Sequence, residues 1–312
     1  MHALKRFGTA FGGYKMMENY PVPECGPDDI ILEIKAAAIC GADMKHWGVD
    51  NGYDDTNITP DQQQSVRGHE FAGEIVKVGE NVKDWHIGQR VVSDNSAHVC
   101  GVCPACEQGD FLCCEHKVNL GLDNNTWGGG FSKYCKVPGE ILAIHKHAIW
   151  EIPEGIKYEE ACVLDPICNA YKAVAQQSHL IPGQDVVVFG TGPLGLFSVQ
   201  VAKLMGAVNI VMVGLDDDVK VRFGVAKELG ATHCVNGSKE DVVARCTEIC
   251  GRDNLGLVIE CSGANIALKQ AIEMTRPNAE IVRVGMGFKP LEFSINLSLI
   301  HISEPTRRVV IS

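Results

Sequence analysis

The chain has 312 residues, of which 46% are apolar and 21% charged, and its 39 acidic and 28 basic side chains give a formal net charge of -11. This composition excludes a disordered or collagen-like chain. The acidic balance argues against nucleic acid as the main partner, because phosphate backbones are bound by clustered lysine and arginine.

No stretch approaches the roughly 18 consecutive apolar residues of a membrane-spanning helix, and the first residues lead into no apolar signal segment. We therefore expect a cytoplasmic protein without a membrane partner. At roughly 150 residues per domain, the length predicts two domains.

The first half of the chain has the pattern of short strands. Alternating apolar stretches predict strands at 30–38, 70–79 and 88–92, joined by glycine-containing turns. Long helical periods are almost absent before about residue 155. A β-rich domain over residues 1–155 follows from this pattern.

The second half alternates strands with helices. A helical pattern covers 159–175, and later segments predict helices at 194–205 and 219–229 and strands at 186–189, 209–213, 257–260 and 281–284. Repeated β-α units predict a doubly wound parallel sheet with helices on both faces. The expected fold is thus α/β, with this second domain over residues 156–296.

The end of the chain differs in character from the rest. Residues 297–307 (LSLIHISEPTR) resemble the conceptual translation of a sequencing adaptor. We expect natural sequence to stop near Asn296 and residues 297–312 to be a non-native tail. The alternative is a genuine tail.

A glycine-rich turn predicts a dinucleotide site. Gly190, Gly192 and Gly195 form a G-x-G-x-x-G motif, with Pro193 and Leu194 between the last two, directly after an apolar strand and at the start of a helix. The glycines allow a tight turn, close approach of the pyrophosphate and close packing of helix and strand. The alternative is a purely structural turn.

An acidic residue about 20 positions further on would bind the ribose of NAD. Counted from Gly195, this place falls between Gly214 and Asp216, and a glycine there would leave room for the 2′-phosphate of NADP. The neighbouring carboxylates would repel that phosphate, so we favour NAD over NADP, with Asp216 as the binding residue. Asp217 and Asp218 are more simply read as a solvated helix start.

The cysteines predict a structural zinc site. The chain holds 14 cysteines, and four follow the spacing C-x2-C-x2-C-x7-C, namely Cys100, Cys103, Cys106 and Cys114. Four thiolates can bind one Zn²⁺ tetrahedrally, whereas a ferredoxin run would place its fourth cysteine after three residues. Cys113 offers a competing spacing, and four unligated buried cysteines are the remaining alternative.

A second, looser set could bind a catalytic metal. Cys40, His69 and Asp165 supply a thiol, an imidazole and a carboxylate, with Asp43 and Glu70 close by in the sequence. Three such ligands suit a catalytic Zn²⁺ that keeps one position for water or substrate. Each of these residues alone is more often a packed side chain.

Five segments together resemble the zinc-dependent medium-chain alcohol dehydrogenase family, most closely its polyol (sorbitol-like) and threonine dehydrogenase branch. The resemblance runs from about residue 20 to about residue 290. The segments are CGAD from Cys40, GHEFAGEIVKVG from Gly68, the cluster from Cys100 to Cys114, LDPICNAYKAV from Leu164 and VVVFGTGPLG from Val186.

This resemblance implies a GroES-like catalytic domain, a Rossmann domain and an active site between them. It also implies that the chain returns to the catalytic domain at its end, a segment that we expect to be truncated here. A homodimer or homotetramer is a further implication.

The resemblance also implies roles for the site residues. Cys40 and His69 would bind the catalytic zinc, Glu70 would be a direct or nearby carboxylate, and Asp165 would be an exchangeable fourth ligand. Asp43 would orient the site. The structural zinc would be held by Cys100, Cys103, Cys106 and Cys114.

Two departures from the family concern proton transfer. Ala42 stands where the family usually has Ser or Thr, and Lys45 stands where a histidine is common, with His46 beside it. The alcohol proton would then leave through zinc-bound water, Glu70, His46 or Lys45.

The predicted function is reversible, zinc-dependent hydride transfer between a secondary alcohol and NAD(P). The substrate would be a small polyol, a sugar alcohol or a 3-hydroxy amino acid. The alternatives are a catalytically weak or inactive NAD-binding protein that retains the structural zinc, for which Ala42 is the motive, and a zinc-free reductase of the same superfamily.

Overall fold

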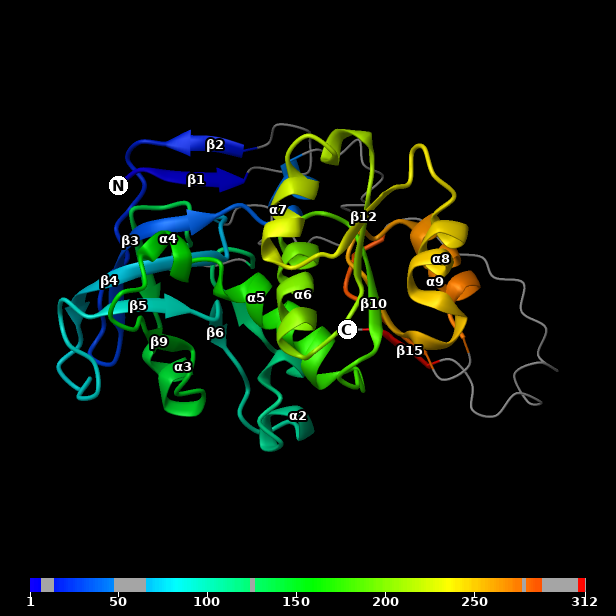
Figure 1. Cartoon of the computed structure of the whole chain (residues 1–312). Coiled ribbons are helices and arrows are strands. Elements are labelled where there is room, and N and C mark those ends of the chain that lie inside the picture. Colours follow the sequence, from blue (N-terminus) through cyan, green and yellow to red (C-terminus); the bar gives the residue numbers. More distant parts are fainter. Residues whose placement is uncertain (7–13, 48–65, 124–126, 277–278, 288–307, 312) are drawn as a thin grey trace. The chain divides into compact units, whose positions relative to one another are not determined.

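The computed structural model describes the chain except for residues 7–13, 48–65, 124–126, 277–278, 288–307 and 312, and it describes only the backbone of residues 6, 45–46, 252–253 and 308–311. The chain forms two compact units, residues 1–165 and 166–312 (Figure 1). No helix in the described stretches is long and apolar enough to cross a membrane.

Antiparallel strands dominate the first unit. Its main sheet has the strand order β8-β3-β4-β5-β9, and β1 pairs with β2 and β6 with β7. The strands are β1 (Ala3–Arg6), β2 (Tyr14–Met17), β3 (Ile30–Ala38), β4 (Glu70–Val78), β5 (Arg90–Ser93), β6 (Ser96–His98), β7 (Val118–Asn119), β8 (Tyr134–Val137) and β9 (Ile149–Glu151). The helical segments are α1 (Gly41–Trp47), α2 (Pro104–Glu107), η4 (Phe111–Cys113), α3 (Gly139–Ile144) and α4 (Tyr158–Ala161).

The pairing of β3 with β4 brings two distant parts of the sequence together. Ala38, the last residue of β3, lies opposite Glu70, the first residue of β4. Ile30 and Leu32 from β3 and Phe71 from β4 are fully buried in the core of this unit. Packing of these apolar residues fixes the register, because a shift of one residue would turn them toward solvent.

The second unit is a parallel sheet of six strands in the order β12-β11-β10-β13-β14-β15. The strands are β10 (Asp185–Phe189), β11 (Ile210–Gly214), β12 (His233–Asn236), β13 (Leu255–Glu260), β14 (Glu280–Arg283) and β15 (Arg308–Ile311). Helical segments are α5 (Leu164–Tyr171), which begins in the first unit, the π-helical turn η5 (Lys172–Gln176), α6 (Pro193–Leu204), the 3-10 turn η6 (Asp216–Asp218), α7 (Arg222–Leu229), α8 (Val242–Asn254) and α9 (Asn265–Met274). The order reverses between β10 and β13, where dinucleotides bind in sheets of this kind.

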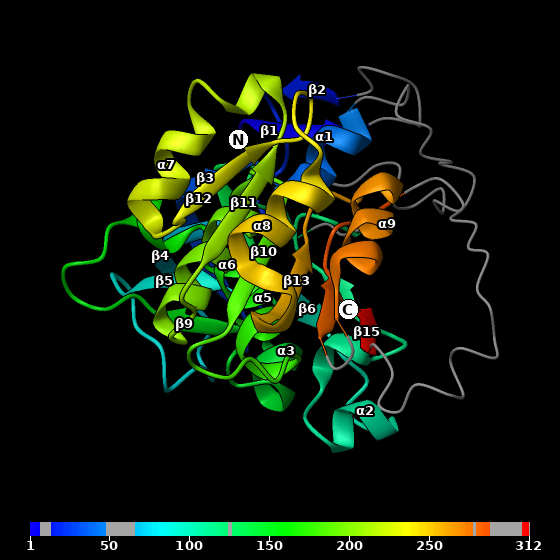
Figure 2. The same cartoon turned by 45° about the vertical axis from the view of Figure 1, so that its right-hand side comes forward.

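Helices cover both faces of this sheet (Figure 2). Helices α6 and α7 pack on one face through a core that includes Val188, Met212 and Ile259, whereas α8 and α9 pack on the other face. This arrangement confirms the predicted α/β fold with a doubly wound sheet.

Some details of the second unit differ from the sequence expectations. The helix expected from residue 219 begins at Arg222, because Asp216–Asp218 form a separate turn before it. Strand β12 was not predicted, since its four residues, HCVN, show no sustained alternation. Strand β15 lies within the segment expected to be non-native and pairs in parallel with β14; the origin of that segment stays a prediction.

Candidate active site

Cys40, His69 and Glu70 come together at one end of the β3–β4 pair. Cys40 follows β3 by two residues, and His69 immediately precedes β4, so the register that pairs Ala38 with Glu70 brings the three residues side by side. Their potential ligand atoms all lie within 4.8 Å of one another. His69 and Glu70 are buried, and Cys40 is half-buried.

Burial governs the protonation of this group in the absence of a cation. Loss of solvation raises the pKa of the Cys40 thiol to about 12 and, together with the negative charge of Asp165, raises the pKa of Glu70 to about 7. A bound cation would reverse this preference, because thiolate and carboxylate are the forms that bind metals. A thiol, an imidazole and a carboxylate within this distance therefore fit a Zn²⁺ ion.

Asp43 supports the group from helix α1. Its Oδ2 accepts a hydrogen bond from the Cys40 backbone N–H at 3.0 Å, and its Oδ1 lies 3.8 Å from Nδ1 of His69. Burial raises the pKa of the Asp43 carboxyl. Asp43 thus hydrogen-bonds to the backbone of Cys40 and lies close to the imidazole of His69.

Asp165 lies near this group without joining it. It is the second residue of α5, and its carboxylate is not among the donors that lie within 4.8 Å of one another. Its Oδ1 accepts a hydrogen bond of 3.4 Å from the Asn95 side chain, and its charge contributes to the raised pKa of Glu70. Asn95 was missed at the sequence level, because a lone Asn in SDNS carries no ligand pattern.

Two of the candidate proton carriers cannot be placed. Lys45 and His46 lie on α1, but their side chains are outside the described residues. Ala42 donates its backbone N–H to the Cys40 sulfur at 3.5 Å and offers no hydroxyl. Glu70 is therefore the described carboxylate within the group that could accept a proton.

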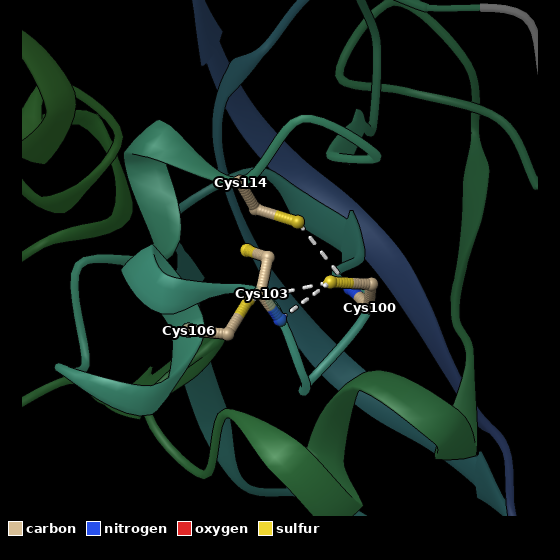
Figure 3. A group of neighbouring side chains, drawn as sticks. All are labelled: Cys100, Cys103, Cys106 and Cys114. Carbon is tan, nitrogen blue, oxygen red and sulfur yellow. Dashed lines mark hydrogen bonds between the residues drawn. The ribbon is translucent and has the colours of Figure 1, made fainter.

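The four predicted cysteines form a second group (Figure 3). Cys103 precedes α2, Cys106 lies on it, and Cys114 follows η4, which together fold the segment back toward Cys100. All four sulfur atoms lie within 4.8 Å of one another. Cys113 is exposed and outside this group, so the x7 spacing rather than the x6 spacing gathers the thiols.

Backbone N–H groups favour the thiolate form of Cys100, whereas burial raises the pKa of Cys106 to about 12. Hydrogen bonds from the Val102 and Cys103 N–H groups lower the pKa of Cys100 to about 6. The Cys103 nitrogen lies 3.3 Å from the Cys100 sulfur. The Cys100 N–H in turn donates to the Cys114 sulfur at 3.3 Å. Four thiols with N–H donors directed at two of their sulfurs fit a closed tetrahedral zinc site.

The glycine-rich turn after β10 has the geometry of a phosphate site. Gly190 has φ +97°, and a Cβ on Gly195 would lie 1.8 Å from the carbonyl oxygen of Gly190. A Cβ on Gly192, which precedes the first turn of α6, would meet nothing within 4 Å. Open space at this helix N-terminus, where Pro193 and Leu194 begin the helix, fits a pyrophosphate.

Asp216 lies at the same edge of the sheet but faces the loop after β12. Its Oδ1 accepts a hydrogen bond from the Asn236 side chain at 2.7 Å and pairs with Lys239 Nζ at 3.2 Å. Both contacts lower the pKa of Asp216. Its carboxylate is therefore already engaged by groups of the protein.

Comparisons with known proteins identify the family of the chain. Residues 26–147 match the model of the alcohol dehydrogenase GroES-like domain, and residues 193–310 match that of the zinc-binding dehydrogenases. The chain is 77% identical over 296 residues to an uncharacterized zinc-type alcohol dehydrogenase-like protein, YdjL, of Escherichia coli K12, which covers 95% of this chain and 80% of that protein.

More distant relatives have named activities. A sorbitol dehydrogenase of Halalkalibacterium halodurans is 31% identical over 93% of this chain and 78% of its own length, and an L-threonine 3-dehydrogenase of Rhizobium etli is 33% identical over 90% and 75%. The crystal structure of 2R,3R-butanediol dehydrogenase from Bacillus subtilis superposes with a TM-score of 0.78 at 31% identity, over 100% of this chain and 84% of that one.

The chain therefore belongs to the zinc-dependent alcohol dehydrogenase family. It is an oxidoreductase of the alcohol dehydrogenase type that acts on small-molecule alcohols with zinc and a nicotinamide cofactor. The alternative of a non-catalytic dinucleotide-binding protein is not favoured, since the similar proteins with named activities are alcohol, polyol and threonine dehydrogenases.

Proposed function

We propose that this enzyme oxidises a secondary alcohol whose neighbouring carbon carries a second polar group, with NAD⁺ as the hydride acceptor. The observation that supports the chemistry is the convergence of Cys40, His69 and Glu70 within 4.8 Å. When bound, zinc supplies a Lewis acid that lowers the pKa of an alcohol hydroxyl, and the nicotinamide accepts the hydride.

The protein's own residues would hold and orient these groups. Cys40 and His69 would bind the metal, with Glu70 beside them as a ligand or as the acceptor of the alcohol proton at its carboxylate. Asp43 would fix the orientation of His69 through Nδ1, which is a common role for a carboxylate beside a metal-binding histidine. Asp165 would serve as an exchangeable ligand.

The thiol group would have a purely structural role. Cys100, Cys103, Cys106 and Cys114 supply four ligands and so leave no open position for substrate. Zinc bound there would fix the loop between β6 and β7, whose two short strands are joined by few backbone contacts.

The substrate class is supported by the relatives rather than by a pocket. Sorbitol, threonine and butanediol, which name three of the similar proteins, each carry a secondary hydroxyl beside a second hydroxyl or an amino group. The preference for NAD⁺ is supported by the carboxylates that follow β11. The family resemblance alone supports a cytoplasmic homodimer or homotetramer.

A substrate panel tests this function. Zinc-loaded protein should reduce NAD⁺ in the presence of butane-2,3-diol, sorbitol or threonine faster than with ethanol. Cys40→Ala should abolish this turnover while NADH binding persists, and Cys25→Ala, a half-buried cysteine of the same unit, should leave both intact. Undiminished turnover in Cys40→Ala, or no turnover with any diol, polyol or 3-hydroxy amino acid of the panel, would contradict the proposal.

A further inference from the structure

Position 214 cannot hold the carboxylate that usually ends the second strand of a dinucleotide-binding sheet. Gly214 is the last residue of β11, and a Cβ built on it would lie 2.6 Å from Phe223 Cε1 and 2.7 Å from Thr191 Cγ2. The same Cβ would lie 2.9 Å from Oδ2 of Asp218. The space in front of this strand end is therefore already filled, in part by another carboxylate.

That carboxylate is tied to the glycine-rich turn. Asp218 Oδ1 accepts a hydrogen bond of 2.5 Å from the hydroxyl of Thr191, which lies between Gly190 and Gly192. Its Oδ2 accepts one of 2.8 Å from the Leu215 N–H. These two contacts fix the carboxylate beside the turn whose geometry fits a pyrophosphate.

Asp218 keeps the capacity to bind a ligand. Its side chain is half-buried, and each carboxylate oxygen can accept more than the one hydrogen bond described. Asp216 is engaged by Asn236 and Lys239, and Asp217 is exposed. Of the three successive aspartates, Asp218 is thus the one whose carboxylate contacts the glycine-rich turn.

We propose that Asp218 takes the place of the missing acid at position 214, accepts hydrogen bonds from the hydroxyls of the adenosine ribose and excludes the 2′-phosphate of NADP. This assignment rests on the proposed use of a nicotinamide dinucleotide and names the residue that selects between the two forms. In a βαβ unit the ribose lies beyond the pyrophosphate at the end of the second strand, where the Asp218 carboxylate replaces the usual side chain.

Basic residues near Asp218 oppose its preference for NAD over NADP. Lys220 and Arg222 are exposed, follow Asp218 closely and would attract a phosphate. Asp218 Oδ2 would lie 2.9 Å from a Cβ at the strand end, and the interaction of two charges weakens with distance and with salt. The Asp218 carboxylate should therefore affect the ribose more than Lys220 and Arg222 do. The preference for NADH over NADPH should decrease at high ionic strength.

The test compares dissociation constants for NADH and NADPH by calorimetry on the full chain, without alcohol. Wild type should bind NADH at least about tenfold more tightly than NADPH, and Asp218→Asn, which keeps the shape but removes the charge, should reduce the ratio about tenfold. Asp217→Asn removes the same charge from the exposed neighbour and should change the ratio by less than about twofold.

Thr191 provides a second, independent variant. Thr191→Val removes the hydroxyl that holds the carboxylate and should reduce the ratio, whereas Thr191→Ser keeps the hydroxyl and should preserve it. The proposal would be overturned if Asp218→Asn left the ratio of the two dissociation constants unchanged, or if Asp217→Asn changed that ratio as much as Asp218→Asn does. Tighter binding of NADPH than of NADH by wild type, or no binding of either dinucleotide, would also overturn it.

Binding and turnover separate this proposal from the proposed function. If Asp218→Asn changes the ratio of the NADPH and NADH dissociation constants but the wild-type enzyme oxidises none of the panel substrates, the role of Asp218 is supported and the proposed function is contradicted. If the enzyme oxidises one of the panel substrates and the ratio is unchanged in Asp218→Asn, only the role of Asp218 is contradicted.

Discussion

Oδ1 of Asp43 lies 3.8 Å from Nδ1 of His69, and both side chains are buried. Within the described part of the chain, neither of these two atoms has a hydrogen-bond partner. Leaving two such atoms unpaired inside a protein is costly, so a function for the pair is expected. A small movement would form a hydrogen bond that fixes the imidazole for metal binding.

Replacing Asp43 by Asn should weaken the site without removing a ligand. We expect zinc affinity or kcat to fall about 10- to 100-fold, as is typical when a carboxylate that supports a metal-binding histidine is lost. Zinc competition with a chelator, together with steady-state kinetics, measures this effect. Asp28→Asn, at an exposed position of the same unit, is the matched control; equal values for the two variants would argue against a positioning role.

The choice between two adjacent cysteines distinguishes the ligand from its neighbour. Cys114 belongs to the thiol group, whereas Cys113 is exposed outside it. Cys114→Ser should lose one zinc per chain and lower the thermal midpoint, while Cys113→Ser should keep both properties. Mass spectrometry of the native protein gives the zinc count, and zinc loss in the Cys113 variant alone would reverse the assignment.

Two glycines of the phosphate turn should respond differently to the same change. A Cβ at Gly192 meets no atom within 4 Å, so Gly192→Ala should change the free energy of unfolding by less than about 0.5 kcal/mol. The variant should nevertheless bind NADH at least about tenfold more weakly, because the added methyl group occupies the space through which the pyrophosphate approaches the turn. At Gly195 the Cβ would overlap the Gly190 carbonyl, so Gly195→Ala should be destabilised by about 3 kcal/mol. Calorimetry and urea unfolding measure both effects; normal NADH binding by Gly192→Ala would contradict the phosphate site.

Asp29 should make the first unit sensitive to acid. Its carboxylate accepts hydrogen bonds from the Gly26 and Gly139 N–H groups and from Lys136 Nζ. Burial acts to raise the pKa of Asp29, but these three contacts outweigh burial and hold it below its usual value. Because the folded pKa is depressed, the stabilisation is present above the unfolded value of about 3.9 and is lost as the pH falls through the folded value.

Asp29→Asn should therefore cost about 1–2 kcal/mol of unfolding free energy at neutral pH and flatten the loss of stability in acid. Urea unfolding at a series of pH values provides the measurement, with Asp28→Asn as the exposed control. A variant with the same acid profile as wild type would show that Asp29 does not contribute this dependence.

Local patterns in the sequence were sufficient for much of the fold. Strand β3 was predicted at its observed bounds, and the alternation of strands and helices predicted the parallel sheet, because burial on one or both faces imposes a period that can be counted. The cysteine spacing likewise identified four thiols that the structure gathers. These features depend on residues close together in the chain.

Features that depend on long-range contacts could not be found this way. Asn95 contacts Asp165 across 70 positions, and Thr191 contacts Asp218 across 27, so neither pair leaves a recognisable spacing. The aspartates after β11 have identical side chains, and only the fold directs Asp216 to Asn236 and Asp218 to the glycine-rich turn.

The central claim is that one chain binds a catalytic and a structural zinc, and the zinc content per chain tests it most directly. Purified wild-type protein should contain two zinc ions per chain, while Cys40→Ala and Cys103→Ser should each contain one. If wild type contains a single zinc that is lost on changing Cys103 and kept on changing Cys40, then Cys40, His69 and Glu70 bind no metal and the proposed mechanism is wrong.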